Sequence, residues 1–308
     1  MKNIGFVFSG QGAQCPGMMK ELYDKYPAVQ NVFKVADETL GRSISELCFN
    51  GTQEELNLTH NTQPCMLAAD LAAFAAISSE GIKPNCVAGF SLGEYAALIV
   101  AGVIEMADAF RLVQFRADAM QLAVPVGVGG MVSLLGVDEE KVKLLCNEID
   151  NGYIDVANYN CPGQIVLSGE KAAIQRAIEL AKEKGIMAIE LAVSAPFHCK
   201  LMAPAADALK AEFAKTSRKD AEIPIYLNVD GNKAQNADEI CEKVILQAKS
   251  AVQWQKTLLS MQHDGVNTVI ELGPGKTLSG LAKRTVKDLN ILRVENEKTL
   301  TETLAKLV

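Results

Sequence analysis

Three kinds of feature are scarce in this sequence of 308 residues: histidines, paired cysteine motifs and long apolar runs. The most apolar long stretch, residues 96–103, is far shorter than the ~20 residues that a membrane-spanning helix needs. None of the eight cysteines belongs to a Cys-x-x-Cys pair, and in a chain of this length they do not indicate a disulfide framework. The amino terminus is interrupted by glycine too soon to be a signal peptide. We therefore expect a cytoplasmic protein with reduced, buried thiols and no membrane partner.

Basic residues are also in deficit. The 37 aspartates and glutamates outnumber the 30 lysines and arginines, which gives a formal net charge of −7 at pH 7. This balance argues against a general nucleic-acid binder and against a protein that binds anionic membranes. With 49% hydrophobic and 22% charged residues, the composition is typical of a globular protein and excludes disorder. An anionic ligand must therefore be bound by positive charge gathered at one place.

Most of the chain alternates short β-branched runs with longer helical patterns, which is typical of an α/β protein whose parallel sheet is covered on both faces. The chain is about twice the ~150 residues of a typical domain, which favours one large domain or a core that carries an insert. The strands predicted for the core are Ile4–Phe8, Cys86–Phe90, Ile223–Asn228 and Thr268–Leu272.

Between Pro125 and Ser194 the pattern changes to the order βαββαβ, the split unit of ferredoxin-like domains. The predicted elements are strands at Met131–Gly136, Tyr153–Tyr159, Gln164–Ser168 and Ile186–Val193, and helices at Asp138–Ile149 and Glu170–Lys184. We therefore predict a large α/β core formed by residues 1–124 and 195–308, and a small ferredoxin-like insert at 125–194. A cleft between two such domains is the default place for a ligand.

The strongest chemical signal is the Gly-Phe-Ser-Leu-Gly sequence at residues 89–93, which follows a predicted strand and precedes a helical pattern. In a GxSxG motif at such a turn, the serine projects from a strained elbow and the glycines leave room for close packing. Ser91 is therefore the candidate nucleophile. The N–H of Leu92, at a helix start, is a candidate oxyanion donor. The alternative is a glycine-rich turn without chemistry.

Two further glycine-rich segments follow predicted strands. The first, Gly10–Gln14, lacks the third glycine of the GxGxxG motif, so a dinucleotide site is not expected there. Its glycines let the backbone approach a ligand closely, and the N–H of Gln11 is a candidate second oxyanion donor; a plain tight turn is the alternative. The second, Gly273–Thr277, fails the spacing of a P-loop and is expected to be a structural turn that has some chance of lining the cleft.

One of the three histidines is the candidate general base. His60 lies in a polar stretch with Pro64 close behind and is interpreted as a loop residue, whereas His263 is expected at a solvated helix end. His198 lies where the chain leaves the predicted insert, so a loop can direct it into the cleft. As a base it would remove the proton of Ser91 and return a proton to the leaving group. A histidine that is merely packed there is the alternative.

Arg116 is the most informative charged residue, because its neighbours three and four positions away on a predicted helix are all apolar. These neighbours are Leu112, Val113, Ala119 and Met120. The guanidinium therefore starts from the inward face and needs an anion, and a planar carboxylate matches its two-pronged donor geometry. That anion is either an aspartate or glutamate of the protein, in a structural ion pair, or the carboxylate of a ligand.

Six segments fall into one order: 10–14, 89–94, the helix around Arg116, 196–198, 252–254 and 271–275. Together they closely resemble the malonyl-CoA:acyl carrier protein transacylases of bacterial fatty acid synthesis, nearly end to end. The resemblance implies an α/β-hydrolase-like core and an acyltransferase without cofactor or metal. It implies transfer of the malonyl group from malonyl-CoA to the phosphopantetheine thiol of acyl carrier protein through a malonyl-serine intermediate, which supplies fatty acid elongation.

The resemblance also implies roles for individual residues. Ser91 is the nucleophile and His198 the base, and Gln247, seven residues before the tryptophan of the 252–254 segment, matches the glutamine that helps to hold the histidine. The backbone amides of Gln11 and Leu92 form the oxyanion hole.

The remaining implied roles concern the substrate. Arg116 holds the malonyl carboxylate, and Asn160 in the insert contacts the substrate. Phe197, which precedes the histidine, crowds a 2-methyl branch and so favours malonyl over methylmalonyl. One departure is Phe90, which stands where many members of the family have histidine, and it removes an imidazole beside the nucleophile.

Other functions share these features. A serine esterase or a patatin-like hydrolase has the same elbow but turns over without a thiol acceptor, and a trans-acting polyketide acyltransferase serves another pathway. A carrier-binding scaffold with a decayed site is the non-enzymatic reading. We expect a monomer and no nucleic-acid partner. Four basic residues near the carboxyl terminus are candidates for contact with an acidic carrier protein, and the alternative is that they form a solvated helix face. They are Lys276, Lys283, Arg284 and Lys287.

Overall fold

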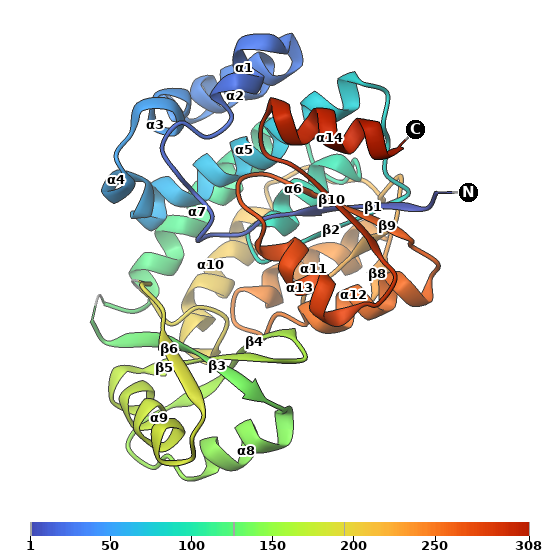
Figure 1. Cartoon of the computed structure of the whole chain (residues 1–308). Helices are drawn as coiled ribbons and strands as arrows, with labels where there is room; N and C mark the ends of the chain where they lie inside the picture. The colour runs from blue at the N-terminus through green and yellow to red at the C-terminus, as the bar shows by residue number, and fades with distance from the viewer. Residues whose placement is uncertain (1, 126, 194, 308) are drawn as a thin grey trace.

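The computed structural model describes residues 2–125, 127–193 and 195–307, which form a mixed α/β structure with two sheets (Figure 1). The larger sheet has the strand order β10-β9-β1-β2-β7-β8 and the smaller one β4-β5-β3-β6. The strands of the larger sheet are β1 (Ile4–Phe8), β2 (Cys86–Gly89), β7 (Ile225–Tyr226), β8 (Lys233–Ala234), β9 (Thr268–Leu272) and β10 (Asn290–Val294). Those of the smaller sheet are β3 (Gly129–Val137), β4 (Ile154–Cys161), β5 (Gly163–Glu170) and β6 (Met187–Glu190).

Helices surround both sheets. The first half of the chain contributes α1 (Lys20–Lys25), α2 (Pro27–Leu40), α3 (Ile44–Asn50), α4 (Gln53–Asn57), α5 (Thr59–Ser79), α6 (Gly93–Val100), α7 (Met106–Ala123) and α8 (Glu139–Asn147). The second half contributes α9 (Lys171–Glu183), a 3₁₀ turn η1 (Lys200–Met202), α10 (Ala203–Phe213), α11 (Ala237–Gln247), α12 (Trp254–His263), α13 (Thr277–Thr285) and α14 (Glu297–Leu307).

Five strands of the larger sheet run parallel, and only β8 pairs antiparallel, with β7. The carboxyl ends of β1, β2, β7 and β9 therefore meet at one edge of the sheet, as parallel strands require. Loops that leave such an edge are the usual place for a ligand in α/β proteins. The segments that begin at Ser9, Phe90, Leu227 and Gly273 all start there.

Side chains alternate between the two faces of the larger sheet, as the twofold period of a strand requires. In β1, Phe6 and Phe8 pack into the cluster that holds helices α5, α6 and α7, whereas Val7 packs into the cluster of α12 and α13. Both faces are thus buried under helices, which explains why these strands are continuous apolar runs.

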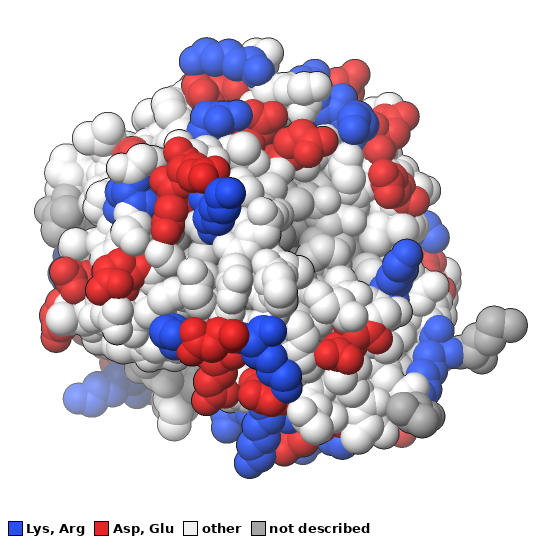
Figure 2. All heavy atoms as spheres, turned by 90° about the horizontal axis from the view of Figure 1, so that it is seen from above, with Lys and Arg blue, Asp and Glu red and all other residues white. Residues whose placement is uncertain are grey.

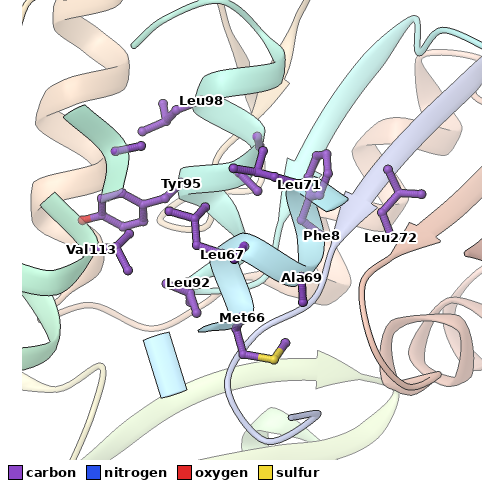
Figure 3. Packing of buried hydrophobic residues seen from close by; sticks show 14 of the residues in the cluster. Phe8, Met66, Leu67, Ala69, Leu71, Leu92, Tyr95, Leu98, Val113 and Leu272 are labelled. Carbon is purple, nitrogen blue, oxygen red and sulfur yellow. The ribbon is translucent and has the colours of Figure 1, made fainter. Parts of the chain in front are cut away.

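Helix α5 lies at the centre of the first layer and is buried along most of its length. Figure 3 shows its residues Met66, Leu67 and Leu71 beside Phe8 of β1 and Tyr95 of α6. The prediction that His60 lies in a loop is wrong, because His60 belongs to the first turns of this helix.

Pro64 lies inside helix α5 and does not break it. Pro64 has no N–H to donate to the carbonyl oxygen of His60, four residues earlier. The Arg42 Nη2 donates to that oxygen instead, at 2.7 Å. A side chain 18 residues away in the sequence thus replaces the missing helical bond.

The smaller sheet is antiparallel and lies in the predicted insert. Alternate residues of β3 face opposite ways: Val132 and Leu134 pack under α8 and α9, whereas Met131 and Ser133 face the larger sheet across a cavity. The βαββαβ order predicted for this region is confirmed, although the turn at 160–163 is tighter than predicted because residues 160 and 161 belong to β4. The predicted domain division at 125–194 stays a prediction, and its last residue, Ser194, lies outside the described residues.

Several bounds differ from the predicted ones. The strand predicted at 223–228 pairs only at Ile225–Tyr226, because the flanking residues turn away to form loops, and the one predicted at 186–193 is limited to Met187–Glu190. The strand predicted to end at Phe90 ends at Gly89, where the elbow begins.

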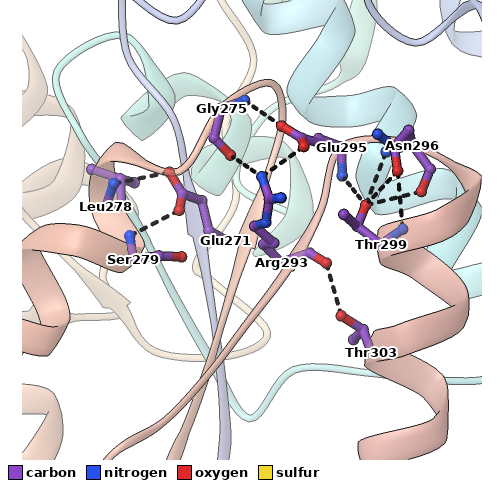
Figure 4. A network of polar contacts seen from close by, with 9 residues as sticks. All are labelled: Glu271, Gly275, Leu278, Ser279, Arg293, Glu295, Asn296, Thr299 and Thr303. Atoms are coloured by element: carbon purple, nitrogen blue, oxygen red, sulfur yellow. Dashed lines mark hydrogen bonds and ion pairs between the residues drawn. The ribbon is translucent and has the colours of Figure 1, made fainter.

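The carboxyl-terminal strands are held by a polar network (Figure 4). The carboxylate of Glu271 in β9 accepts hydrogen bonds from the N–H groups of Leu278 (2.9 Å) and Ser279 (2.8 Å) at the start of α13. A buried carboxylate is stabilised there because the first N–H groups of a helix have no partner within it. These two bonds join the end of β9 to the start of α13, on either side of the turn at 273–277.

Charged side chains of both signs are interspersed on the surface seen from above in Figure 2. The net charge of −7 is therefore not gathered into one acidic field on this face. Charge that selects a ligand has to be sought in the cleft rather than here.

Candidate active site

Ser91 lies at the sharp turn between β2 and α6, with a left-handed φ of 53°. The two glycines of the motif are required by close approach. A Cβ on Gly89 would lie 1.9 Å from the carbonyl carbon of Gly93, and a Cβ on Gly93 would lie 2.2 Å from the oxygen of Phe8. The turn can therefore form only with glycine at these positions. It directs Ser91 out of the sheet edge into a cavity, as the sequence predicted.

His198 is the imidazole beside Ser91. Its Nε2 lies 2.7 Å from the Ser91 Oγ, and its Nδ1 lies 3.0 Å from the backbone oxygen of Gln247. Because a carbonyl oxygen can only accept, we assign the proton to Nδ1, which leaves the Nε2 lone pair facing the serine hydroxyl. Burial, followed by the nearby charge of Arg116, lowers the pKa of His198 to about 4. The imidazole is thus neutral near pH 7 and able to accept a proton.

Arg116 is buried on α7, and its Nη2 lies 3.2 Å from the Ser91 Oγ. Its other partners are neutral: Nη1 donates to the Gln63 Oε1 at 2.8 Å, and Nη2 donates to the Gln247 Oε1 at 3.1 Å. Within the part of the chain that the structure describes, no carboxylate lies within ion-pair distance of the guanidinium, and its Nε has no partner. The ion pair weighed as an alternative in the sequence is therefore not found. The buried cation remains available to the carboxylate of a ligand.

Gln247 connects Arg116 to a buried glutamate. Its Nε2 donates to the Glu94 Oε2 at 2.7 Å and to the backbone oxygen of Ser91 at 2.8 Å. Gln247 contacts His198 through its backbone oxygen, and its side chain contacts Arg116, Glu94 and the backbone of Ser91. Burial raises the pKa of Glu94 to about 8, against the lowering effect of its hydrogen bonds and of Arg116.

Two backbone N–H groups near Ser91 are free to bind an oxyanion. Neither Gln11 nor Leu92 donates its N–H to another described residue, and both residues line the cavity. The loop that carries Gln11 packs closely on the elbow, since a Cβ on Gly10 would lie 2.7 Å from the oxygen of Phe90. The two donors predicted from the sequence therefore lie on adjoining segments beside the nucleophile.

The cavity has a volume of about 290 Å³ and lies between the two sheets. Asn160 and Phe197 both line it, and the Oδ1 of Asn160 is buried without a partner among the described residues, so it is free for a ligand. Phe90 forms another wall, with its ring edge-on to Trp254 at a centroid distance of 5.4 Å. Thr277 and Arg284 of α13 also line the cavity, so the last residue of the turn at 273–277 forms part of its wall.

The other two histidines are remote from this chemistry. The His60 side chain is exposed on α5, and the His263 side chain is 89% exposed at the end of α12. The prediction that both lie at the surface is confirmed.

Three polar residues of this hydrogen-bond network were not identified from the sequence: Gln63, Glu94 and Asn228. Glu94 lies in the 89–94 segment named above, and a signal that could have identified it is a charged residue at the start of an otherwise apolar helical pattern. Asn228 lies more than 100 residues from Ser91 in the sequence, and Gln63 lies more than 50 residues from Arg116. No local sequence pattern indicates either residue.

Other kinds of site are not found. No helix in the described ranges has both the length and the apolar character to cross a membrane. No group of three or more His, Cys, Asp or Glu side chains suited to a metal ion is found in those ranges. All eight cysteines are unpaired, and Cys15 alone among them is exposed.

Comparison with known proteins gives consistent matches over nearly the whole chain. The model of the acyl transferase domain matches residues 5–304. A malonyl CoA-acyl carrier protein transacylase of Bacillus subtilis is 43% identical over 303 residues, which cover 97% of this chain and 96% of that protein. One from Escherichia coli K12 is 42% identical, with 94% of each chain covered.

Solved structures agree as well. The crystal structure of the malonyl CoA-acyl carrier protein transacylase of Clostridium perfringens superposes with a TM-score of 0.96 at 42% identity, covering 100% of this chain and 97% of that one. Another neighbour, at 38% identity and a TM-score of 0.96, is a malonyl-transacylase in complex with a type II PKS acyl-carrier protein; 99% of this chain and 100% of that one are covered.

Proposed function

This chain belongs to the acyl transferase domain family, and we propose that Ser91 and His198 are its catalytic pair. The protein is an acyltransferase that moves a malonyl group from malonyl-CoA to the thiol of acyl carrier protein, and it supplies fatty acid elongation. The observation that carries the assignment of the site is that the Ser91 Oγ lies 2.7 Å from the Nε2 of His198 and 3.2 Å from the Nη2 of Arg116, a buried cation with no carboxylate partner in the described chain.

The first half-reaction begins when the Ser91 Oγ attacks the thioester carbon while His198 Nε2 takes its proton. The oxygen of the thioester becomes negative and is stabilised by the N–H groups of Gln11 and Leu92. When the carbon–sulfur bond breaks, the imidazolium returns its proton to the thiol of coenzyme A. The product is a malonyl ester on Ser91.

The second half-reaction runs the same steps with a new thiol. The phosphopantetheine thiol of the carrier gives its proton to His198 and attacks the ester carbon, and the Ser91 Oγ leaves and takes that proton back. No acidic side chain is needed to orient the imidazole, because the backbone oxygen of Gln247 accepts the Nδ1 proton. A thioester and an oxygen ester are both attacked more easily than an amide, so a dyad suffices.

Arg116 selects the malonyl group by its carboxylate. The guanidinium is buried and bonded only to neutral groups in the described chain, so a malonyl carboxylate supplies the charge that it lacks. Asn160 offers an unpaired amide oxygen to the bound substrate, and Phe197 limits space at C2.

The finer assignments are also proposals. The strand order of the larger sheet supports an α/β-hydrolase-like core, and the order β4-β5-β3-β6 supports a ferredoxin-like insert. A cofactor-free reaction, a cytoplasmic location and a monomeric state stay predictions.

The test of the proposed function uses two additions in sequence. Malonyl-CoA is added to the protein, and the adduct is measured by intact mass; the holo form of an acyl carrier protein is then added. Transfer predicts that the adduct is stable until the carrier arrives and then appears on the carrier. An esterase would instead lose the adduct to water and release free malonate without any thiol.

A second acceptor deserves the same assay. A structural neighbour was solved with a type II PKS acyl-carrier protein, which favours a polyketide carrier as an alternative partner. Equal amounts of a fatty acid carrier and a polyketide carrier are added together. The ratio of the two malonylated products then shows which carrier the enzyme prefers.

A further inference from the structure

Asn228 is a buried polar residue that lies just beyond the end of β7 and belongs to no motif. Its side chain makes two hydrogen bonds to the elbow. The Oδ1 accepts from the N–H of Ser91 at 2.7 Å, and the Nδ2 donates to the backbone oxygen of Gly89 at 2.6 Å. One amide therefore bonds both sides of the turn that carries the nucleophile.

The main chain of Asn228 is fixed by two further bonds. Its N–H donates to the Glu94 Oε1 at 2.6 Å, and its carbonyl oxygen accepts from the N–H of Gln253 at 2.7 Å. The neighbouring Val252 pairs in turn with β4 of the smaller sheet, where its N–H donates to Ala157 and its oxygen accepts from Tyr159. Asn228 is thus anchored to α6 on one side and to the segment that holds the smaller sheet on the other.

The elbow needs such a contact because Ser91 has a φ of 53°, a conformation that costs a residue with a Cβ roughly 1–2 kcal/mol. If the Ser91 N–H lost its acceptor, the peptide would be free to rotate toward ordinary angles. That rotation would move the Ser91 Oγ away from His198 and would turn the next N–H, that of Leu92, out of the cavity.

We propose that Asn228 is a positioning residue of the transfer reaction: its side-chain amide holds the strained elbow so that the Ser91 Oγ and the Leu92 N–H face the same reacting carbon. The inference rests on the proposed function, because it assigns a role within the same site. It also explains the 252–254 segment, whose Gln253 holds the carbonyl oxygen of Asn228.

The test compares Asn228→Ala with a matched control far from the cavity. In Thr303→Val, a buried side chain on α14 loses one hydrogen bond, the 2.8 Å bond to the backbone oxygen of Arg293. Both variants are assayed for melting temperature, for the dissociation constant of malonyl-CoA and for the rate constant of Ser91 malonylation in a single turnover.

We expect Asn228→Ala to acylate about 100-fold more slowly, as small misplacements of reacting groups do. Its affinity for malonyl-CoA should stay within about threefold of wild type, because Arg116 is untouched. Thr303→Val should lose melting temperature but acylate at the wild-type rate. An Asn228→Ala protein that acylates at the wild-type rate, or that loses only substrate affinity, overturns the inference.

A second measurement does not depend on how the variant folds. In the wild-type protein, the Ser91 amide proton is buried against Asn228 and should exchange with solvent slowly, whereas the unpaired amide of Leu92 should exchange faster. Rapid exchange at Ser91 overturns the inference. If the wild-type protein itself takes up no malonyl group, the proposed function fails instead, so the two failures are distinguishable.

Discussion

Replacement of Arg116 by alanine tests the selectivity for malonyl most sharply. Arg116 is 2% exposed, and in the described chain no carboxylate pairs with its guanidinium. Malonyl-CoA therefore offers a carboxylate to Arg116, whereas the acetyl group of acetyl-CoA offers none. The two substrates are otherwise handled by the same serine and histidine.

The size of the effect follows from the burial of the pair. Removal of one partner from a buried charge pair costs about 3–5 kcal/mol, which corresponds to a loss of roughly a hundredfold to several thousandfold. Acetyl transfer loses no pairing with a carboxylate. It loses the bonds from the Arg116 guanidinium to Ser91, Gln63 and Gln247 and some packing, and should fall less than about tenfold.

The assay measures kcat/KM for serine acylation with both thioesters. Arg116→Lys keeps the charge without the two-pronged donor geometry and should lie between wild type and Arg116→Ala for malonyl. Arg42→Ala is the matched control, since Arg42 also bonds to neutral partners on α5 and α7 but lies outside the cavity. It should affect both thioesters equally. Equal losses of malonyl and acetyl transfer in Arg116→Ala would refute the role of this residue in binding the carboxylate.

The geometry of the site leads to four further predictions. The pKa of His198 is lowered to about 4, so single-turnover acylation should persist from pH 7 to pH 5 and fall only as the pH passes through about 4, where the base becomes protonated; a decline centred near pH 6.5 would contradict the burial argument. The same shift affects stability, because between pH 6.5 and about 4 the unfolded chain binds a proton at His198 that the folded chain does not. The free energy of unfolding should therefore fall by about 3 kcal/mol as the pH falls through that window, which urea unfolding at several pH values measures. His60→Ala and His263→Ala should retain wild-type acylation, because both side chains are exposed and remote from Ser91, and an inactive variant of either would mean that a second imidazole takes part. Phe197→Ser should raise the ratio of methylmalonyl to malonyl acylation about tenfold by opening space for one methyl group, and an unchanged ratio in a competition assay would remove Phe197 from the selectivity.

The buried strands were predictable because their composition alone determines them. Ile4–Phe8 and Thr268–Leu272 are short apolar runs between glycine or polar residues, and both bounds are those of β1 and β9. Asn290–Val294 was missed, since its alternation of polar and apolar residues follows a short, charged turn and gives a weaker signal at the sheet edge.

The candidate site was predictable where chemistry lies in a local motif. Ser91 and Leu92 could be identified because the elbow needs glycines at fixed spacing, and Arg116 because a charge on an apolar helical stripe is unusual. Asn228 could not be identified, because its importance comes from bonds to residues more than 100 positions away in the sequence. The contact between Gln247 and His198 was expected only from the resemblance to the family, and no local pattern indicates it because the backbone oxygen makes it, whatever the residue type.

The direct test of the central claim is to locate the acyl group. The protein is mixed briefly with malonyl-CoA, quenched in acid, digested and analysed by mass spectrometry. The mechanism predicts a malonyl ester on Ser91 and no malonyl adduct in Ser91→Ala. A malonyl group on any other residue, or an adduct of equal yield in Ser91→Ala, would contradict it.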